Sequence, residues 1–490
     1  MAADQTRSHY QVTFVVMAVS VSAYALLQSL VIPVLTTMQK DLHTSQTTVT
    51  WVLTAYLLSA SVSTPIIGRI GDKVGKEKMM VAALVALTLG SVVAAVATNI
   101  DVMIVARVVQ GIGGGVLPLA FGIIRDEFPE DKIPGAVSLI ASLLAVGAGA
   151  GLVLAGPIVS VLDYHWLFWI PAIVTAIAAV ATVVFVPESP VRTPGKISVL
   201  PAVLLSVWLV ALLLALSEGQ TWGWGSGRVL GLFVASIVIA TLWIMVENRS
   251  ESPLIDMTMM RLPAVWTTNL VALLVGFGMY AAFGFLPEFS QTANVHGYGF
   301  DASITKSGLI LLPSSVAMFF LGLYSAPAAR RLGAKTVVVA GSLIIALSMA
   351  VIAFAHDHIW QLAVASGILG IGVGLVFACL SNLIVAAVPP HQTGVASGMN
   401  ANIRTIGGSI GSAVMATIVT SKVYPDDFPH ESGYTNGFIA LTIAMLVCAA
   451  VALLIPRVTA SVIEEHLLDE PEHAQAGIVA AATLVGDKPE

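Results

Sequence analysis

The stretch Gly68-Arg-Ile-Gly-Asp-Lys-Val-Gly-Lys-Glu-Lys78 decides the fold class of this chain. It lies between two long apolar segments and holds four of the chain's 22 basic residues, with Asp72 among them. Gly68, Gly71 and Gly75 allow the backbone to turn tightly, and cations at the end of an apolar helix stop it from sliding further into lipid. The stretch therefore predicts a basic turn between two membrane spans.

The composition agrees with a membrane protein. The chain has 490 residues, of which 57% are hydrophobic and only 10% charged, whereas soluble domains average about 25% charged residues. A formal net charge of −6 favours no nucleic-acid partner. Cys379 and Cys448 both lie in apolar runs, so we expect small buried residues and neither a disulfide nor a metal site.

A membrane-spanning helix needs about 20 mostly apolar residues. Fourteen segments meet this requirement, and we expect an all-α polytopic protein with spans at about 12–37, 50–68, 79–98, 102–124, 135–158, 165–187, 197–217, 229–247, 264–288, 305–326, 335–355, 360–387, 395–420 and 435–456.

The basic residues predict the orientation. If the N-terminus is cytoplasmic, most of the 22 basic residues fall on the cytoplasmic side, as the positive-inside rule requires. The exceptions are Lys40, Arg228, Lys306 and Lys422 outside, and Arg107 and Arg404 within spans. We therefore expect a multi-pass protein of the cytoplasmic membrane with both termini in the cytoplasm.

The chain repeats its key stretch. The segment 322–335, Gly-Leu-Tyr-Ser-Ala-Pro-Ala-Ala-Arg-Arg-Leu-Gly-Ala-Lys, keeps the glycines and the basic cluster but lacks the acid. Related halves around a midplane site are a common transporter plan. The predicted domains are a cytoplasmic N-terminus (1–11), an N-terminal six-helix bundle (12–187), a linker with two inserted spans (188–250), a C-terminal six-helix bundle (251–456) and an acidic cytoplasmic tail (457–490).

Two arginines lie within predicted spans, where charges are costly and usually functional. Arg107 shares a helix face with Gln110, Gly111 and Gly114 by three- and four-residue spacing. Arg404 shares one with Ser397, Asn400, Gly408 and Gly411. Arg404 serves equally well as a hydrogen-bond hub between helices or as a substrate contact. The glycine run after Arg107 follows no strand, which argues against a nucleotide-binding loop.

The fifth span contains a stripe of small residues, in which Gly147, Gly151 and Ala155 recur every four residues, followed by Gly156. Such a stripe lets a neighbouring helix approach closely. We expect it to be a packing surface between helices.

These features occur in the order of three motifs of the major facilitator superfamily: Asp72 with its glycines, Arg107-Val-Val-Gln-Gly111, and the stripe of 147–156. With fourteen spans and Gly219-Gln-Thr-Trp-Gly-Trp224, the chain resembles the drug:proton antiporter-2 family over about residues 10–456. The resemblance implies the major facilitator fold, two six-helix bundles plus two inserted helices, and proton-driven export of amphipathic drugs and antibiotics. It also implies that Asp72 latches the two halves through nearby arginines and a helix N-terminus, in a gating motif of Gly68, Gly71, Asp72, Lys73, Gly75 and Lys76.

The chain departs from that family in two places. Where the family carries Asp-x-Thr-Ile-Val-x-x-Ala-Leu-Pro, this sequence has Tyr24-Ala-Leu-Leu-Gln-Ser-Leu-Val-Ile-Pro33, and a phenol does not titrate near neutral pH. In the third motif Leu152 occupies a proline position and Ala155 a glycine position. The proton must therefore bind elsewhere.

Three residues are the candidates for proton coupling: Arg107, Glu288 and Asp126. Burial disfavours the charged form of a carboxyl group, so a desolvated Glu288 can exchange protons near neutral pH. The alternatives are a solvated Glu288 at the outer headgroup level, and an Asp126 that pairs with Arg125 or Lys132.

The central cavity is expected to be apolar and aromatic, which favours lipophilic neutral or cationic substrates over sugars or phosphates. Its candidate lining residues are Tyr24, Gln28, Tyr56, Gln110, Phe277, Tyr280, Phe285, Asn400 and Arg404.

We expect a monomer that works with the lipid bilayer, a small amphipathic substrate and protons, with the proton gradient in place of a cofactor. An exporter of a lipid or lipid-like metabolite is the alternative within transport. A polytopic membrane enzyme is a third possibility, although no His/Asp/Glu or nucleophile cluster stands at a membrane face. A transporter-like sensor would bind its ligand without flux.

Overall fold

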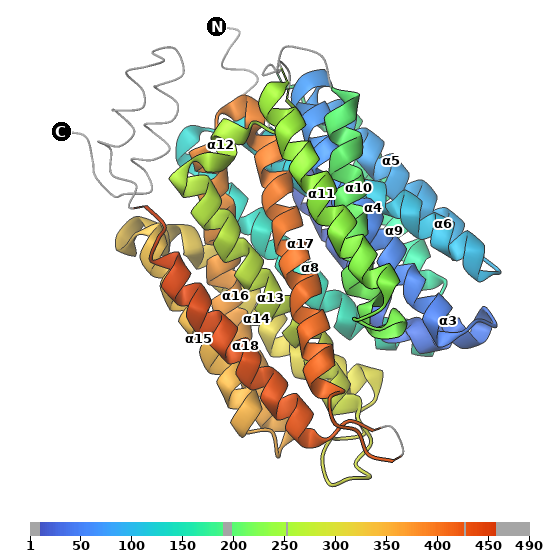
Figure 1. Ribbon diagram of the computed structural model, residues 1–490. Coiled ribbons are helices and arrows are strands. Elements are labelled where there is room, and N and C mark those ends of the chain that lie inside the picture. Colours follow the sequence, from blue (N-terminus) through green and yellow to red (C-terminus); the bar gives the residue numbers. More distant parts are fainter. Residues whose placement is uncertain (1–9, 190–197, 251–252, 426–427, 457–490) are drawn as a thin grey trace, which may run out of the picture.

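The computed structural model describes residues 10–189, 198–250, 253–425 and 428–456. These residues form a bundle of long helices (Figure 1). The first half comprises α2 (Tyr10–Ser29), α3 (Leu35–Asp41), α4 (Gln46–Val74), α5 (Lys76–Ala95), α6 (Ile100–Gly111), α7 (Val116–Glu127), α8 (Ile133–Val161) and α9 (Trp166–Phe185). The rest comprises α10 (Val199–Trp222), α11 (Gly227–Arg249), α12 (Met257–Arg261), α13 (Pro263–Gln291), α14 (Ile304–Leu332), α15 (Ala334–Phe354), α16 (Ile359–Ala387), α17 (Thr393–Val419) and α18 (Glu431–Ala452).

Each of the fourteen predicted spans corresponds to helix in the structure. Thirteen described segments are long and apolar enough, by length and composition, to cross a membrane. The remaining span is α17, a 27-residue helix whose Asn, Ser, Thr and Gly residues lower its hydropathy. It packs against α13, α4 and α18. Most of its polar residues are buried or half-buried, which is where a membrane helix tolerates them.

Two predicted spans are interrupted. In the first, Pro33 lies in a short 3-10 segment (Ile32–Val34) between α2 and α3, because proline has no N–H to continue the helix. In the fourth, α6 and α7 are joined by the 3-10 segment Ile112–Gly115. Its glycines permit close approach, since a Cβ at Gly114 would lie 2.6 Å from the Thr64 hydroxyl oxygen.

The two halves share one local design. Both α4 and α14 are 29-residue helices, and each ends at a glycine with positive φ, 133° at Gly75 and 84° at Gly333. Each is followed at once by the next helix, α5 or α15. Likewise, a short 3-10 turn precedes both α8 and α17. These correspondences support the internal repeat predicted from the sequence.

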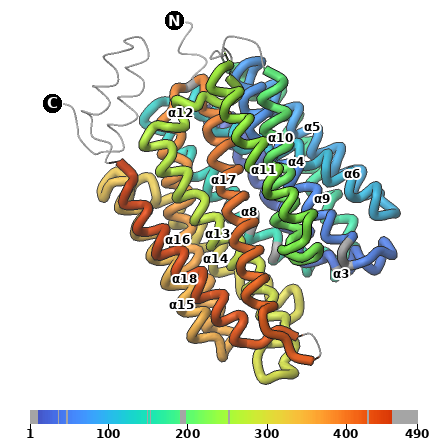
Figure 2. The backbone as a smooth tube through the Cα atoms, in the orientation of Figure 1, coloured from blue at the N-terminus to red at the C-terminus, as the bar shows by residue number. Residues whose placement is uncertain are grey.

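The inserted helices α10 and α11 pack against each other, and α10 also contacts α4 and α17 (Figure 2). The Thr54 and Ser217 hydroxyl groups are 3.0 Å apart, and the Gln220 amide donates to the Thr417 hydroxyl at 2.9 Å. One inserted helix therefore bridges the two halves.

Candidate functional site

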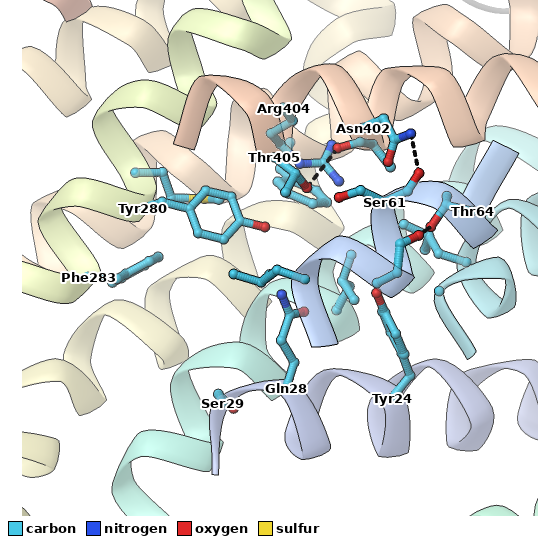
Figure 3. Close-up of a pocket in the computed structure, with 18 of the residues that line it drawn as sticks. Tyr24, Gln28, Ser29, Ser61, Thr64, Tyr280, Phe283, Asn402, Arg404 and Thr405 are labelled. Atoms are coloured by element: carbon cyan, nitrogen blue, oxygen red, sulfur yellow. Dashed lines mark hydrogen bonds between the residues drawn. The ribbon is translucent and has the colours of Figure 1, made fainter. Parts of the chain in front are cut away.

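A cavity of about 290 Å³ lies between the two halves (Figure 3). Residues of α2, α4, α7 and α8 line one side, and residues of α13, α14, α16 and α17 line the other. The apolar part of the wall is formed by aliphatic and aromatic side chains: Ile32, Leu57, Leu117, Leu144, Met279, Phe283, Met318 and Phe377. The polar part consists of Tyr24, Gln28, Ser29, Ser61, Thr64, Tyr280, Asn402, Arg404, Thr405 and Ser412.

Four of the residues expected to line the cavity do so: Tyr24, Gln28, Tyr280 and Arg404. The other five lie outside its lining, as follows. Tyr56 and Gln110 are buried beside Arg107. The Phe277 and Phe285 rings pack against the hydrophobic core. The Asn400 amide donates to the Asn269 side chain at 2.8 Å.

On α17, the helix face that lines the cavity is rotated by about one residue from the face that the sequence spacing predicts. Gly408 and Gly411 do not face the cavity but α13, because a Cβ at Gly411 would lie 2.1 Å from the Phe277 carbonyl oxygen. The cavity face instead carries residues 401, 402, 404, 405 and 412, most of which repeat at helical spacing. Glycines on this helix thus mark the packing face.

Arg107 is fully buried and forms a compact network. Its Nε donates to the Val52 carbonyl at 2.9 Å, and one of its terminal nitrogens donates to Gln110 at 2.7 Å. Gln110 in turn donates to Ser91 at 3.0 Å, and the guanidinium lies 4.2 Å from the centre of the Tyr56 ring. The cation is therefore held by a carbonyl, an amide and a ring.

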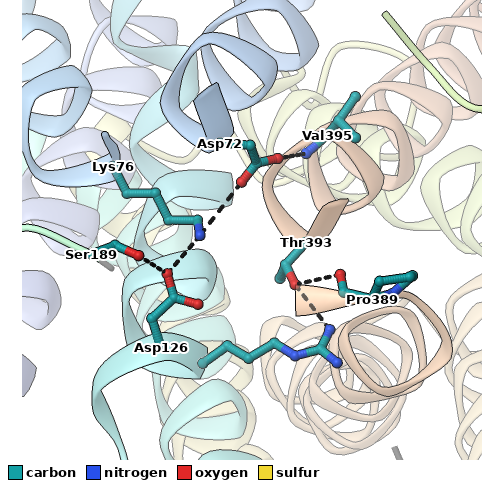
Figure 4. Close-up of polar contacts among 8 residues, drawn as sticks. Asp72, Lys76, Asp126, Ser189, Pro389, Thr393 and Val395 are labelled. Atoms are coloured by element: carbon teal, nitrogen blue, oxygen red, sulfur yellow. Dashed lines mark hydrogen bonds and ion pairs between the residues drawn. The ribbon is translucent and has the colours of Figure 1, made fainter. Parts of the chain in front are cut away.

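At one end of the bundle, Asp72 joins the two halves (Figure 4). It lies in the last turn of α4, is fully buried, and accepts a hydrogen bond from the backbone N–H of Val395 at 3.2 Å. Val395 is in the first turn of α17, where the free N–H groups and the helix dipole favour an anion. Gly394 permits this approach, since a Cβ there would lie 2.9 Å from the Asp72 carboxylate.

The predicted basic turn is more compact than the sequence indicates. Gly68 and Gly71 are helical, and Gly75 is the one residue between α4 and α5. Lys76 is not a surface cation: it is fully buried, its Nζ donates to Asp126 at 2.6 Å, and it lies 3.7 Å from Asp72. Lys73 is partly exposed.

Asp126 accordingly pairs with Lys76, and it also accepts a hydrogen bond from Ser189. The neighbouring Arg125 reaches the other half, where it donates to the Val385 carbonyl and, at 2.9 Å, to the Thr393 hydroxyl. We call Asp72, Lys76, Arg125, Asp126 and the first turn of α17 the gate cluster. It places charged side chains of the first half against backbone and hydroxyl groups of the second half.

The repeat produces a second contact between the halves at the same end. Arg330, in the last turn of α14, donates to the Asp131 carbonyl just before α8 at 3.1 Å. The repeated segment of the second half lacks the acid, so Arg330 makes the contact there in place of an aspartate. Toward the opposite end the two halves diverge (Figure 1). Several described hydrogen bonds between the halves lie at the gate end, and another, from the Asn402 amide to the Ser61 carbonyl at 2.6 Å, lies at the cavity.

The small residues of α8 face two helices. A Cβ at Gly151 would lie 2.0 Å from the Ser29 hydroxyl of α2, and one at Gly147 would lie 2.5 Å from Ala25. A Cβ at Gly156 would lie 2.4 Å from the Thr305 hydroxyl of α14, and Ala155 is buried. Close packing therefore holds α8 between its own half and the other half.

Glu288 lies in the last turn of α13, away from the gate end. It is exposed, and its carboxylate accepts a hydrogen bond from the Tyr434 hydroxyl at 3.0 Å. Solvent therefore reaches this carboxyl group in the observed conformation. The predicted acidic tail lies outside the described residues.

Comparisons with known proteins show which family shares this architecture. The family profile of the Major Facilitator Superfamily matches residues 17–412 and 268–476. The tetracenomycin C resistance and export protein of Streptomyces glaucescens is 28% identical over 433 residues, which cover 86% of this chain and 78% of that protein. The methylenomycin A resistance protein of Streptomyces coelicolor is 28% identical over 416 residues, covering 84% and 85%.

A multidrug resistance protein B homolog of Mycobacterium tuberculosis is 28% identical over 392 residues, covering 78% of this chain and 71% of that protein. Among solved structures, the human organic anion transporter MFSD10 superposes with a TM-score of 0.65 at 17% identity, covering 91% of this chain and 99% of that chain. At that identity the likeness concerns the fold alone. With two repeated halves, a cavity between them and a profile match across most of its length, the chain belongs to the major facilitator superfamily.

Proposed function

We propose that this protein exports amphipathic, lipophilic compounds, among them drugs and antibiotics, across the cytoplasmic membrane by alternating access. The observation that carries the proposal is the central cavity, which lies between two halves that are latched at one end by the gate cluster. The export and resistance functions named for similar proteins support the direction and the substrate class.

The gate end is assigned to the cytoplasm because the basic turns after α4 and α14 lie there. With this end closed, the structure corresponds to an outward-facing state. Opening the gate requires α17 to leave Asp72, and Arg125 to leave Val385 and Thr393. The two halves would then rock about the packed pairs of α8 with α14 and α4 with α17.

Export against a gradient needs an energy source, and we assign this role to proton antiport. Buried carboxyl groups couple proton binding to conformation, because burial disfavours their charged form. In the observed state Asp126 and Asp72 share Lys76 inside the closed gate, whereas Glu288 is open to solvent. Arg107 has no described carboxylate partner, so it supplies positive charge beside the cavity.

The proposal is tested by expressing the full chain in a bacterium that lacks its main efflux pumps. Resistance is scored across a panel of lipophilic compounds, with and without a protonophore at a concentration that does not arrest growth. We expect resistance to several compounds that disappears with the protonophore. Resistance that persists would contradict proton coupling, and no resistance to any compound would contradict drug export. Movement of a labelled lipid without any soluble drug would favour the alternative, a lipid exporter.

A further inference from the structure

The central cavity carries one charged side chain among its described lining residues, and that side chain is a cation. Arg404 lines the cavity, while no aspartate, glutamate, lysine or histidine does. The other polar groups of the wall are hydroxyl and amide groups. The charge of the substrate site is therefore set by an arginine.

Arg404 is held in place but has no counter-ion among the residues that the structure describes. Only 5% of the residue is exposed, and its guanidinium lies 4.0 Å from the centre of the Phe377 ring, so one face is covered. Its Nε has no hydrogen-bond partner among the described residues. Tyr280, which interacts with it, offers a hydroxyl group and not a carboxylate. A buried cation without a carboxylate is costly, and it leaves a donor for an incoming anion.

The surroundings add to the positive potential. Arg107, close behind the cavity wall, is fully buried, and one of its terminal nitrogens also lacks a partner in the described part of the chain. None of the described ion pairs involves either arginine. The buried acids of the gate cluster, Asp72 and Asp126, are paired with Lys76. Among the described lining residues, a cationic compound would meet one arginine and no carboxylate, with a second buried arginine behind the wall.

We infer that the central cavity prefers amphipathic organic anions, such as aromatic or aliphatic carboxylates, over cations of the same size, and that Arg404 binds the anionic group. The planar guanidinium suits a carboxylate, which can accept two hydrogen bonds from it. The apolar wall around Met279 and Phe283 accommodates the rest of such a molecule. This inference rests on the proposed export function and replaces the expectation of neutral or cationic substrates with a narrower class.

The test uses three probes that share a fluorophore and a short alkyl chain: dansyl-aminocaproate, its methyl ester, and dansylcadaverine, which carries an amine. Binding to the purified full chain is measured from dansyl emission, with the signal in excess unlabelled compound subtracted. We expect the carboxylate to bind about 10- to 100-fold more tightly than the amine, the range for a hydrogen bond to a charged group. Equal affinities, tighter amine binding, or no binding of any probe would overturn the inference.

Variants locate the effect. Arg404→Gln should lose most of the preference for the carboxylate, and Arg404→Lys should keep the preference with a lower affinity, because the charge remains and the fork is lost. Thr442→Val, on α18 and outside the cavity lining, is the control and should keep the preference. A folded Arg404→Gln variant with the full preference would contradict the role of this residue. If Arg404→Gln does not fold, the affinities of Arg404→Lys for the three probes are compared with those of the wild type instead. The role of Arg404 then predicts the same preference with a lower affinity for the carboxylate.

Flux separates this inference from the export function. A wild-type protein that prefers the carboxylate in binding but moves no compound in proteoliposomes would refute export and leave the anion site standing. A protein that exports compounds but prefers the amine would refute the anion site and leave export standing.

Discussion

Replacing Asp72 by Asn tests whether the gate cluster holds the two halves together. The variant keeps the shape of the side chain and an oxygen that can accept from Val395, but it removes the charge. A hydrogen bond to a charged group contributes about 1.5–3 kcal/mol, against about 0.5–1.5 kcal/mol for a neutral pair. The closed gate should therefore lose about 1–2 kcal/mol, which shifts the equilibrium toward the open state about 5- to 30-fold.

The fold itself should survive this change. Lys76 keeps Asp126 as a partner at 2.6 Å, so neutralising Asp72 leaves no buried lysine without a carboxylate. We therefore expect a folded, membrane-inserted protein with reduced export. Unfolding of Asp72→Asn would instead assign this residue a structural role.

The assay measures the distance between spin labels on the two halves at the gate end. Val74 at the end of α4 and Leu332 at the end of α14 are exposed and suit labelling, and the native Cys379 and Cys448 are buried. We expect one short distance in the wild-type protein and an added longer population in the variant. Asp357→Asn, the same change at an exposed aspartate outside the gate cluster, is the matched control. Unchanged distances with wild-type transport would refute the latch.

Three further changes probe the packing and the coupling. Gly394→Ala would place a Cβ 2.9 Å from the Asp72 carboxylate, so it should open the gate and lower export. Gly135→Ala is the control and should leave both unchanged, because nothing lies within 4 Å of the added atom. Normal gate distances in Gly394→Ala would contradict the packing argument. Gly407→Ala would place a Cβ 1.9 Å from a backbone oxygen of α13 and should lower the thermal stability by about 1–3 kcal/mol, measured by unfolding in detergent. Glu288→Gln should abolish substrate-dependent proton flux in vesicles. Tyr434→Phe removes the hydrogen bond but keeps the carboxyl group, so this variant should retain the proton flux. Normal coupling in Glu288→Gln would remove this residue from the mechanism.

The helices and their repeat could be predicted because their causes are local. A run of apolar residues predicts a span wherever it occurs, and even the polar α17 was long enough to be recognised. The break at Pro33 also follows from a local rule, since proline cannot donate a hydrogen bond. The end of α4 was harder to predict: Gly68 and Gly71 permit a turn, but they serve close helix contacts with Gly394 and Leu119.

The partners of the site residues could not be predicted because they depend on contacts distant in sequence. Lys76 reads as a surface cation, and only the fold buries it between Asp72 and Asp126. On α17, Asn400 and Arg404 share a face by spacing, yet the packing of the glycines turns Asn400 toward Asn269 and leaves Arg404 at the cavity. A one-residue rotation of a helix is below the precision of sequence patterns.

In the proposed mechanism, a proton gradient drives amphipathic compounds through the cavity between the two halves. It is tested most directly with the purified protein in sealed proteoliposomes, in which an imposed pH gradient is the one energy source and the uptake of a labelled compound is followed with time. We predict accumulation above equilibrium that collapses when a protonophore is added. Uptake that stops at equilibrium whatever the pH gradient, or that is unaffected by the protonophore, would contradict the account.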